Sequence, residues 1–168
     1  MPSVVVRSAG NESGDFAHIF VNGIDVSQNE RGYNIVVIDL LNNKVESKSF
    51  DTFSSVEESA RLAQFIDQIP NGRRVAVAVR DTADGRPDMS PKLSEQAVNA
   101  LRSVGASQDL RGKFRWSYAF IGVKGAALGS ACEWASETMP TQCVVGIGAM
   151  EPNVAAAIQS MRIEPTAK

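Results

Sequence analysis

The sequence predicts an α+β domain in which mostly antiparallel sheets, arranged as a sandwich, are flanked by two α-helices. Three observations support this fold class. Strand-like segments outnumber helix-like ones, the two helices fall inside the strand series, and the strand candidates of the first 50 residues are joined without any helix. A doubly wound fold, in which strands and helices alternate regularly, is therefore disfavoured. The chain has 168 residues, so we expect residues 1–168 to form a single domain.

The first half of the chain resembles a meander of strands. Segments 3–8 and 16–21 are rich in Val, Ile and Phe, and the Asn-Gly pair at 22–23 is typical of a type I′ hairpin turn. Segment 33–41 is apolar on both faces, which indicates a central strand. After the Asn-Asn turn at 42–43, segment 44–50 alternates like a half-exposed partner strand.

The first helix is predicted to begin after Ser55, which forms a capping box with Glu58. The Pro-Asn-Gly sequence at 70–72 ends it. Its buried stripe has helical spacing and consists of Leu62, Phe65, Ile66 and Ile69.

The second helix is predicted to open at Ser90-Pro91 and to end at Gly105. Its buried face consists of Leu93, Ala97, Ala100, Leu101 and Val104. The remaining strand candidates are 74–80, 118–123 and 142–150, and the segment 153–163 fits a short helix or a strand.

Composition excludes several classes of protein. The formal net charge is −2, from 17 basic and 19 acidic residues without any block of like charge, so we expect no nucleic-acid partner. The apolar runs are too short to span a bilayer, so we expect no membrane insertion. Met1–Arg7 lacks the pattern of a signal peptide. We therefore expect either a protein that stays inside its cell or a module of a longer exported chain.

Signatures of catalysis, cofactors and metals are missing from the sequence. No P-loop, nucleophile elbow or zinc-protease motif occurs, and the single histidine, His18, lies in an apolar segment. We expect no cofactor, no metal and no enzymatic activity. Cys132 and Cys143 are consistent with a pair of reduced thiols or with a short disulfide-closed loop.

The polar loop 80–90 follows a buried strand and contains three aspartates. Their spacing does not match a calcium-binding EF-hand loop. Asp84 and Asp88 are expected to cap turns and the helix start at Ser90, whereas Asp81 lies at the strand end, where sheet proteins often present functional side chains.

The stretch FRWSYAFIGVKG, residues 114–125, concentrates four aromatic residues around one arginine. Tyr118 and Phe120 are expected to belong to the core. Arg115 and Trp116 precede the strand, where packing explains them less well. A guanidinium beside an aromatic face and a nearby carboxylate suits a polar ring-shaped ligand such as a sugar.

Four ordered motifs resemble one known family. They are NERGYNIVVIDLLNNKVESKSFDTFSS, VAVAVRDTADG, LSEQAVNALRSVGAS and FRWSYAFIGVKG. The chain resembles the GG domain of the interleukin-like EMT inducer and PANDER cytokine-like family, and is most similar to the stem domain of protein O-linked mannose N-acetylglucosaminyltransferase. The resemblance covers about residues 3–125, with the core motifs at 31–125.

The resemblance implies a fold of antiparallel sheets with flanking helices. It also implies a non-catalytic role. In the transferase stem, an aspartate and an arginine of these motifs contact β-linked N-acetylglucosamine, and they correspond here to Asp81 and Arg115. Lys124 and Gly125 match a Lys-Gly turn whose role looks structural. The family's acidic residue after the arginine is replaced by Trp116, a candidate stacking platform.

The sequence thus predicts a carbohydrate-binding module that recognises a sugar such as β-linked N-acetylglucosamine through Asp81, Arg115 and Trp116. Such a module would belong to a larger surface, tail or glycan-processing protein, with a carrier polypeptide or an oligomer as a further partner. The family is extracellular or lumenal, and the chain also fits a microbial or viral surface module. The alternative is a structural or protein–protein interaction module without a working sugar pocket.

Overall fold

The computed structural model describes residues 1–146. The strands are β1 (Val4–Gly10), β2 (Phe16–Val21), β3 (Ile24–Asp25), β4 (Gly32–Ile38), β5 (Val45–Phe50), β6 (Arg74–Asp81), β7 (Ser117–Val123), β8 (Cys132–Ser136) and β9 (Thr141–Val145); the helices are α1 (Val56–Asp67), α2 (Glu95–Arg102) and the short 3-10 helix η1 (Asn11–Ser13). The segment 153–163 and the end of the strand expected over 142–150 lie outside the described residues.

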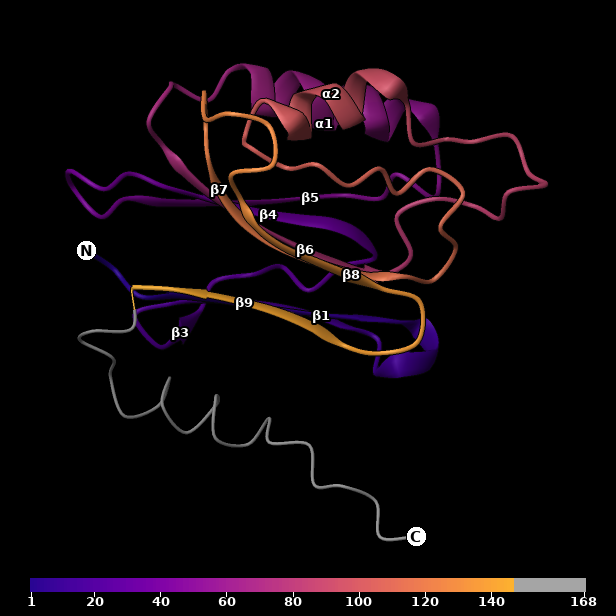
Figure 1. Ribbon diagram of the computed structural model, residues 1–168, viewed down its shortest axis with the longest axis horizontal. Coiled ribbons are helices and arrows are strands. Elements are labelled where there is room, and N and C mark those ends of the chain that lie inside the picture. Colours follow the sequence, from indigo (N-terminus) through magenta and orange to yellow (C-terminus); the bar gives the residue numbers. More distant parts are fainter. Residues whose placement is uncertain (147–168) are drawn as a thin grey trace, which may run out of the picture.

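The elements form three layers (Figure 1). Helices α1 and α2 cover one face of a middle sheet with the order β5-β4-β6-β7-β8, and a lower sheet with the order β3-β2-β1-β9 lies against its other face. All strand pairs are antiparallel except β1–β6, which pair in parallel over two residues, Ala9 with Arg80 and Gly10 with Asp81. This mostly antiparallel α+β sandwich confirms the predicted fold class.

The middle sheet separates two hydrophobic cores, which explains why its central strands are apolar on both faces. The alternation of β6 shows this directly. Val75, Val77 and Val79 pack toward the helices, whereas Ala76 and Ala78 pack toward the lower sheet. All five are fully buried. The small alanine side chains allow the two sheets to approach each other closely.

Turn and cap signals account for several boundaries. Asn22 and Gly23 both adopt positive φ, as a type I′ turn requires, and they join β2 to β3. The Ser55 hydroxyl accepts a hydrogen bond from the backbone N–H of Glu58, so the predicted start of α1 is confirmed. Strand β8 was not expected from the sequence, because it is an edge strand of mixed composition without an apolar run.

The predicted start of the second helix at Ser90-Pro91 is wrong. Helix α2 begins at Glu95, with the Ser94 hydroxyl accepting a hydrogen bond from the Ala97 N–H. The buried Asp84 carboxylate accepts hydrogen bonds from the backbone N–H groups of Lys92 and Leu93 at 3.0 and 3.2 Å. These bonds hold the preceding segment as a loop and prevent it from continuing the helix.

The two cysteines are free thiols. The Cys143 thiol donates to the backbone carbonyl of Cys132 at 3.0 Å, and its burial raises its pKa. Because the thiolate is the reactive species, we expect Cys143 to be alkylated only slowly in the native protein at neutral pH. Thiol titration should find two thiols after denaturation, and reductant should leave the melting temperature unchanged. A melting temperature lowered by reductant would indicate a bridge.

Candidate functional site

The site predicted from the sequence lies at a corner of the sandwich, where β6 leaves the middle sheet and meets β1. Asp81 ends β6, and Arg115 lies two residues before β7. Both adopt the left-handed backbone conformation, with φ of 62° and 63°. Non-glycine residues reach this region at a cost of order 1–3 kcal/mol, and such positions cluster at functional sites. The corner therefore holds both residues in strained conformations.

Three backbone segments converge at this corner. Gly10 pairs with Asp81, and the peptide of Arg115 crosses directly over Gly10. A Cβ atom on Gly10 would lie 1.8 Å from the Arg115 carbonyl oxygen, so only glycine permits this approach. The Arg115 N–H donates to the Thr82 hydroxyl at 2.9 Å. The position of Arg115 is thus fixed by its close approach to Gly10 of β1 and by its bond to Thr82, which directly follows β6.

The buried hydroxyl of Ser8 joins the strands behind the corner. It accepts a hydrogen bond from the Tyr118 N–H at 2.8 Å and donates to the Val79 carbonyl. Because β6 turns away from β7 here to pair with β1, this hydroxyl replaces backbone hydrogen bonds that the two strands no longer make with each other. The start of β7, and with it the preceding Arg115, is held against the end of β6.

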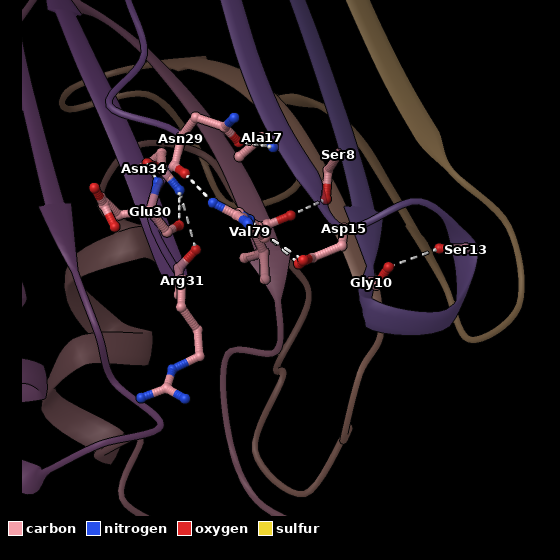
Figure 2. A network of polar contacts seen from close by, with 12 residues as sticks. Ser8, Gly10, Ser13, Asp15, Ala17, Asn29, Glu30, Arg31, Asn34 and Val79 are labelled. Carbon is pink, nitrogen blue, oxygen red and sulfur yellow. Dashed lines mark hydrogen bonds and ion pairs between the residues drawn. The ribbon is translucent and has the colours of Figure 1, made fainter.

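A polar network fixes the other side of the corner (Figure 2). The Arg80 guanidinium donates to both Asp15 carboxylate oxygens at 3.2 Å and to the Asn29 carbonyl at 2.5 Å. The side chain of Asn34 holds the backbone of Glu30 from both directions, accepting from its N–H at 2.9 Å and donating to its carbonyl at 2.7 Å. These bonds immobilise the segment that carries Arg31 into β4.

The hydrogen-bond donors of the Arg115 side chain are only partly used within residues 1–146. One terminal nitrogen donates to the Glu12 carboxylate at 2.7 Å, and Glu12 is 79% exposed. The Arg115 Nε is buried and has no hydrogen-bond partner among the described residues. A buried donor without a partner is costly, so its presence needs a reason. The guanidinium lies over the ring of Phe114, 4.9 Å from the ring centroid.

The Asp81 carboxylate makes no hydrogen bond or ion pair within residues 1–146, although charged groups surround it. Burial, together with the nearby Asp15 carboxylate, raises the pKa of Asp81, while Arg31 and Arg115 act in the opposite direction. Both guanidinium groups are therefore close enough to act on the carboxylate, yet neither bonds to it. Asp81 is a half-buried, unused acceptor.

The raised pKa gives Asp81 a testable effect on stability. Between the ordinary carboxyl pKa and the raised one, the folded protein binds more protons than the unfolded chain, so stability falls as pH rises through this interval. Asp81→Asn removes the charge, and Asn tolerates the left-handed conformation well. We expect its melting temperature at pH 7 to equal or exceed that of the wild type. The difference should shrink below pH about 4; a lower melting temperature at pH 7 would contradict this account.

The ring of Trp116 lies under Lys113 and not under Arg115. The Lys113 ammonium group is 4.9 Å from the centroid of this ring. The ring that stacks on Arg115 belongs to Phe114, which sequence reasoning did not select. Phe114 in turn contacts Phe53, with ring centroids 6.1 Å apart. Phe114 and Trp116 both precede β7, so of the four aromatic residues of this stretch Tyr118 and Phe120 lie within the strand.

Arg31 is a second residue that sequence reasoning missed. Its guanidinium makes a bidentate ion pair with Asp51 and lies 5.1 Å from the centroid of the Phe53 ring. Arg31 lies near the start of the first family motif of the chain, and Asp51 and Phe53 lie near the end of the same motif. Their chain positions placed them in one motif, but only the fold shows that Arg31 and Asp51 lie close enough to act on the pKa of Asp81.

Two hollows lie near the middle sheet, and neither includes Asp81 or Arg115. A cleft of about 450 Å³ lies between the end of α1 and the β4–β5 hairpin, at the opposite end of β4. A more open hollow of about 540 Å³ is lined by Arg31 and Asp51 and adjoins the corner. The candidate site is therefore an exposed corner with an open hollow beside it.

The remaining polar candidates have structural partners. His18 bonds to Asp25 at 2.8 Å. The Lys124 N–H donates to the Arg73 carbonyl and the Gly125 N–H donates to the Ser103 carbonyl, as expected for a structural Lys-Gly turn. Within residues 1–146, no three metal-ligating side chains form a group and no helix has the length and hydropathy to cross a membrane.

The fold and motifs define a small β-sandwich module with helices on one face. The family model described as interleukin-like EMT inducer matches residues 31–126, more than half of the chain. The chain therefore belongs to this family, as the motifs predicted.

Curated relatives include the cell migration-inducing and hyaluronan-binding proteins of Mus musculus and Homo sapiens. They are 38% and 36% identical over 100 residues, which cover 59% of this chain and 7% of each relative. The cell surface hyaluronidase of Danio rerio is 31% identical over 129 residues, covering 76% of this chain and 8% of that protein. The chain thus matches less than a tenth of the length of these relatives.

Proposed function

We propose that this chain is a non-catalytic carbohydrate-binding module that recognises an amino sugar, such as β-linked N-acetylglucosamine, at the Asp81–Arg115 corner. The observation that carries this proposal is the pair of polar groups held there on strained backbone: the Asp81 carboxylate, which has no hydrogen-bond partner within residues 1–146, and the partly exposed guanidinium of Arg115. A sugar offers hydroxyl donors to the first and hydroxyl or acetamido acceptors to the second.

The affinity for a single sugar should be modest. Neutral hydrogen bonds contribute about 1 kcal/mol each and charged ones about 1.5–3 kcal/mol, which corresponds to dissociation constants from about mM to tens of μM. The exposed Glu12 must release part of Arg115, and surface ion pairs of this kind are weak. The fixed backbone limits the entropy lost on binding. Several copies on one carrier would raise the avidity.

The names of the relatives support a glycan as the ligand. Two are named as hyaluronan-binding and one as a hyaluronidase. A binding role, as opposed to hydrolysis, is supported by the carboxylates around Asp81. Most glycosidases use two carboxyl groups that flank the scissile bond, whereas here Asp15 is bonded to Arg80 and Asp51 to Arg31.

A second candidate function is a protein–protein interaction module. It is favoured by two large apolar side chains exposed on and before β8, Trp134 and Leu128, which are 63% and 66% exposed. Single exposed apolar residues are common on protein surfaces, so this observation is weaker than the paired polar groups of the corner.

A glycan array separates the two functions. The wild-type protein, presented in multivalent form, should bind glycans that contain amino sugars in a graded manner, and Asp81→Ala should lose this binding. Arg111→Ala is a control, because Arg111 is exposed and, within residues 1–146, forms an ion pair only with the nearby Asp109. An array without any glycan bound would overturn the carbohydrate proposal and favour the interaction module.

A further inference from the structure

A continuous cationic–aromatic surface extends from the corner. We call it the ladder, and it consists of the rings of Phe53 and Phe114 with the cations Arg31, Arg86, Lys92 and Arg115. The two rings are 6.1 Å apart between centroids. Over Phe53 lie the cationic groups of Arg31 at 5.1 Å and Lys92 at 5.7 Å; over Phe114 lie those of Arg115 at 4.9 Å and Arg86 at 5.2 Å.

The ladder carries positive charge that the described residues do not neutralise. Arg31 pairs with Asp51 and Arg115 with Glu12. Neither Arg86 nor Lys92 has a carboxylate within 4.0 Å in residues 1–146. The Lys92 ammonium group donates to the Ser54 carbonyl at 3.1 Å, and Arg86 is exposed. Two cations without a carboxylate within 4.0 Å in residues 1–146 thus lie over two neighbouring rings, in a chain whose net charge is −2.

Stacking holds these cations without using their hydrogen-bond donors. A guanidinium placed over a phenyl ring is attracted by the ring face, while its N–H groups still point outward in its own plane. This planar fork matches a carboxylate, which it can bind in a bidentate manner. Arg86 therefore presents an oriented and unoccupied carboxylate receptor.

The ladder adjoins the proposed sugar site. Arg115 belongs to both, and Arg31, at the other end of the ladder, acts electrostatically on Asp81. A polymer whose first sugar is bound at Asp81 and Arg115 would place its next sugar over neighbouring residues. The ladder is the neighbouring surface that is positively charged, so it would select an acidic sugar at that position.

We infer that the ladder is a second subsite, which binds the carboxylate of a uronic acid beside the amino sugar, so that the ligand is an acidic polysaccharide in which the two sugars alternate. This inference rests on the proposed function and adds Arg86 and Lys92 as the residues that discriminate acidic from neutral glycans. The carboxylate receives charge-assisted hydrogen bonds from Arg86, and Lys92 adds a second positive charge.

The test uses two probes that differ only in their carboxyl groups: a hyaluronan oligosaccharide and its carboxyl-reduced counterpart of the same length. Titrations compare the wild type, the double variant Arg86→Gln and Lys92→Gln, and the control Lys44→Gln. Lys44 is exposed and lies at the turn between β4 and β5, at the opposite end of the middle sheet. Thermal melting confirms that each variant is folded.

We expect the wild type and Lys44→Gln to bind the acidic probe about tenfold or more tightly than the neutral one, the difference expected for one charge-assisted hydrogen bond. Raising the salt concentration should reduce this preference because exposed charges are screened, and the double variant should lose it. A sulfated neutral-backbone oligosaccharide that binds as tightly as the acidic probe would contradict selection of a carboxylate.

Three other results separate this inference from the proposed function. Equal binding of both probes by the wild type, lost in Arg115→Ala, would overturn the ladder subsite and leave the sugar site intact. Binding of the acidic probe that survives Arg115→Ala but not the double variant would overturn the sugar site and leave an anion site on the ladder. Failure of the wild type to bind either probe would overturn both.

Discussion

Replacing Phe120 by alanine is expected to lower the free energy of unfolding by about 3–5 kcal/mol, the usual cost of emptying a buried aromatic site. Phe120 is fully buried in β7, between β6 and β8, and its ring lies 5.4 Å from that of Tyr118. It has no polar atoms in its side chain, so its removal leaves a cavity in the helix-facing core and no unpaired hydrogen-bond donor. Urea denaturation measures the loss.

Leu41→Ala is the control for this substitution, because Leu41 is 92% exposed in the turn between β4 and β5. Its effect should stay within about 0.5 kcal/mol. A comparable loss of stability in the two variants would show that the β7 aromatics do not anchor the strand that follows Arg115.

Gly10→Ala is expected to have the second largest effect, and to act on stability and on the site together. Its new methyl group would lie 1.8 Å from the Arg115 carbonyl oxygen and 2.8 Å from its carbon. These are backbone atoms, so no side-chain rotation relieves the contact. The segment that carries Arg115 must move, at a cost of about 1–3 kcal/mol or more. We expect a lower melting temperature and at least tenfold weaker sugar binding.

Gly85→Ala is the matched control for Gly10→Ala. The three atoms nearest to a Cβ atom there all belong to the Met89 side chain, at 3.3 Å or more, and that side chain is flexible and exposed. Its effect should be much smaller on both measurements. Unchanged sugar binding by a folded Gly10→Ala protein would mean that the placement of Arg115 does not matter for the ligand.

Local signals predicted those parts of the fold that depend on neighbouring residues. The Asn22-Gly23 turn and the Ser55 cap are fixed by interactions within a few residues, and both were predicted. The start of α2 was not, because the Asp84 carboxylate that holds Lys92 and Leu93 is contributed by another segment of the loop. Strand β8 was missed for a similar reason, since its pairing with β7 determines it more than its composition does.

The candidate site was predictable in part. Asp81 and Arg115 were selected because they match family motifs, and the fold places both at one corner. Their left-handed backbone was not predictable, since Arg does not favour it and Asp, although enriched there, adopts it in a minority of cases. Arg31 and Phe53 lie at opposite ends of one motif and Phe114 lies about 60 residues further along the chain, so their stacking arises only from tertiary structure.

The most direct test of the central claim is calorimetric titration of an N-acetylglucosamine oligosaccharide into the wild type and Arg115→Ala, with thermal melting of both. Arg115 is partly exposed and alanine has a similar strain at its φ of 63°, so the fold should persist. The account predicts binding between about mM and tens of μM for the wild type. Arg115→Ala should show no detectable binding at a nearly unchanged melting temperature. Undiminished binding by Arg115→Ala would contradict the assignment of the sugar site to Arg115, and unfolding of the variant would show instead that Arg115 has a structural role.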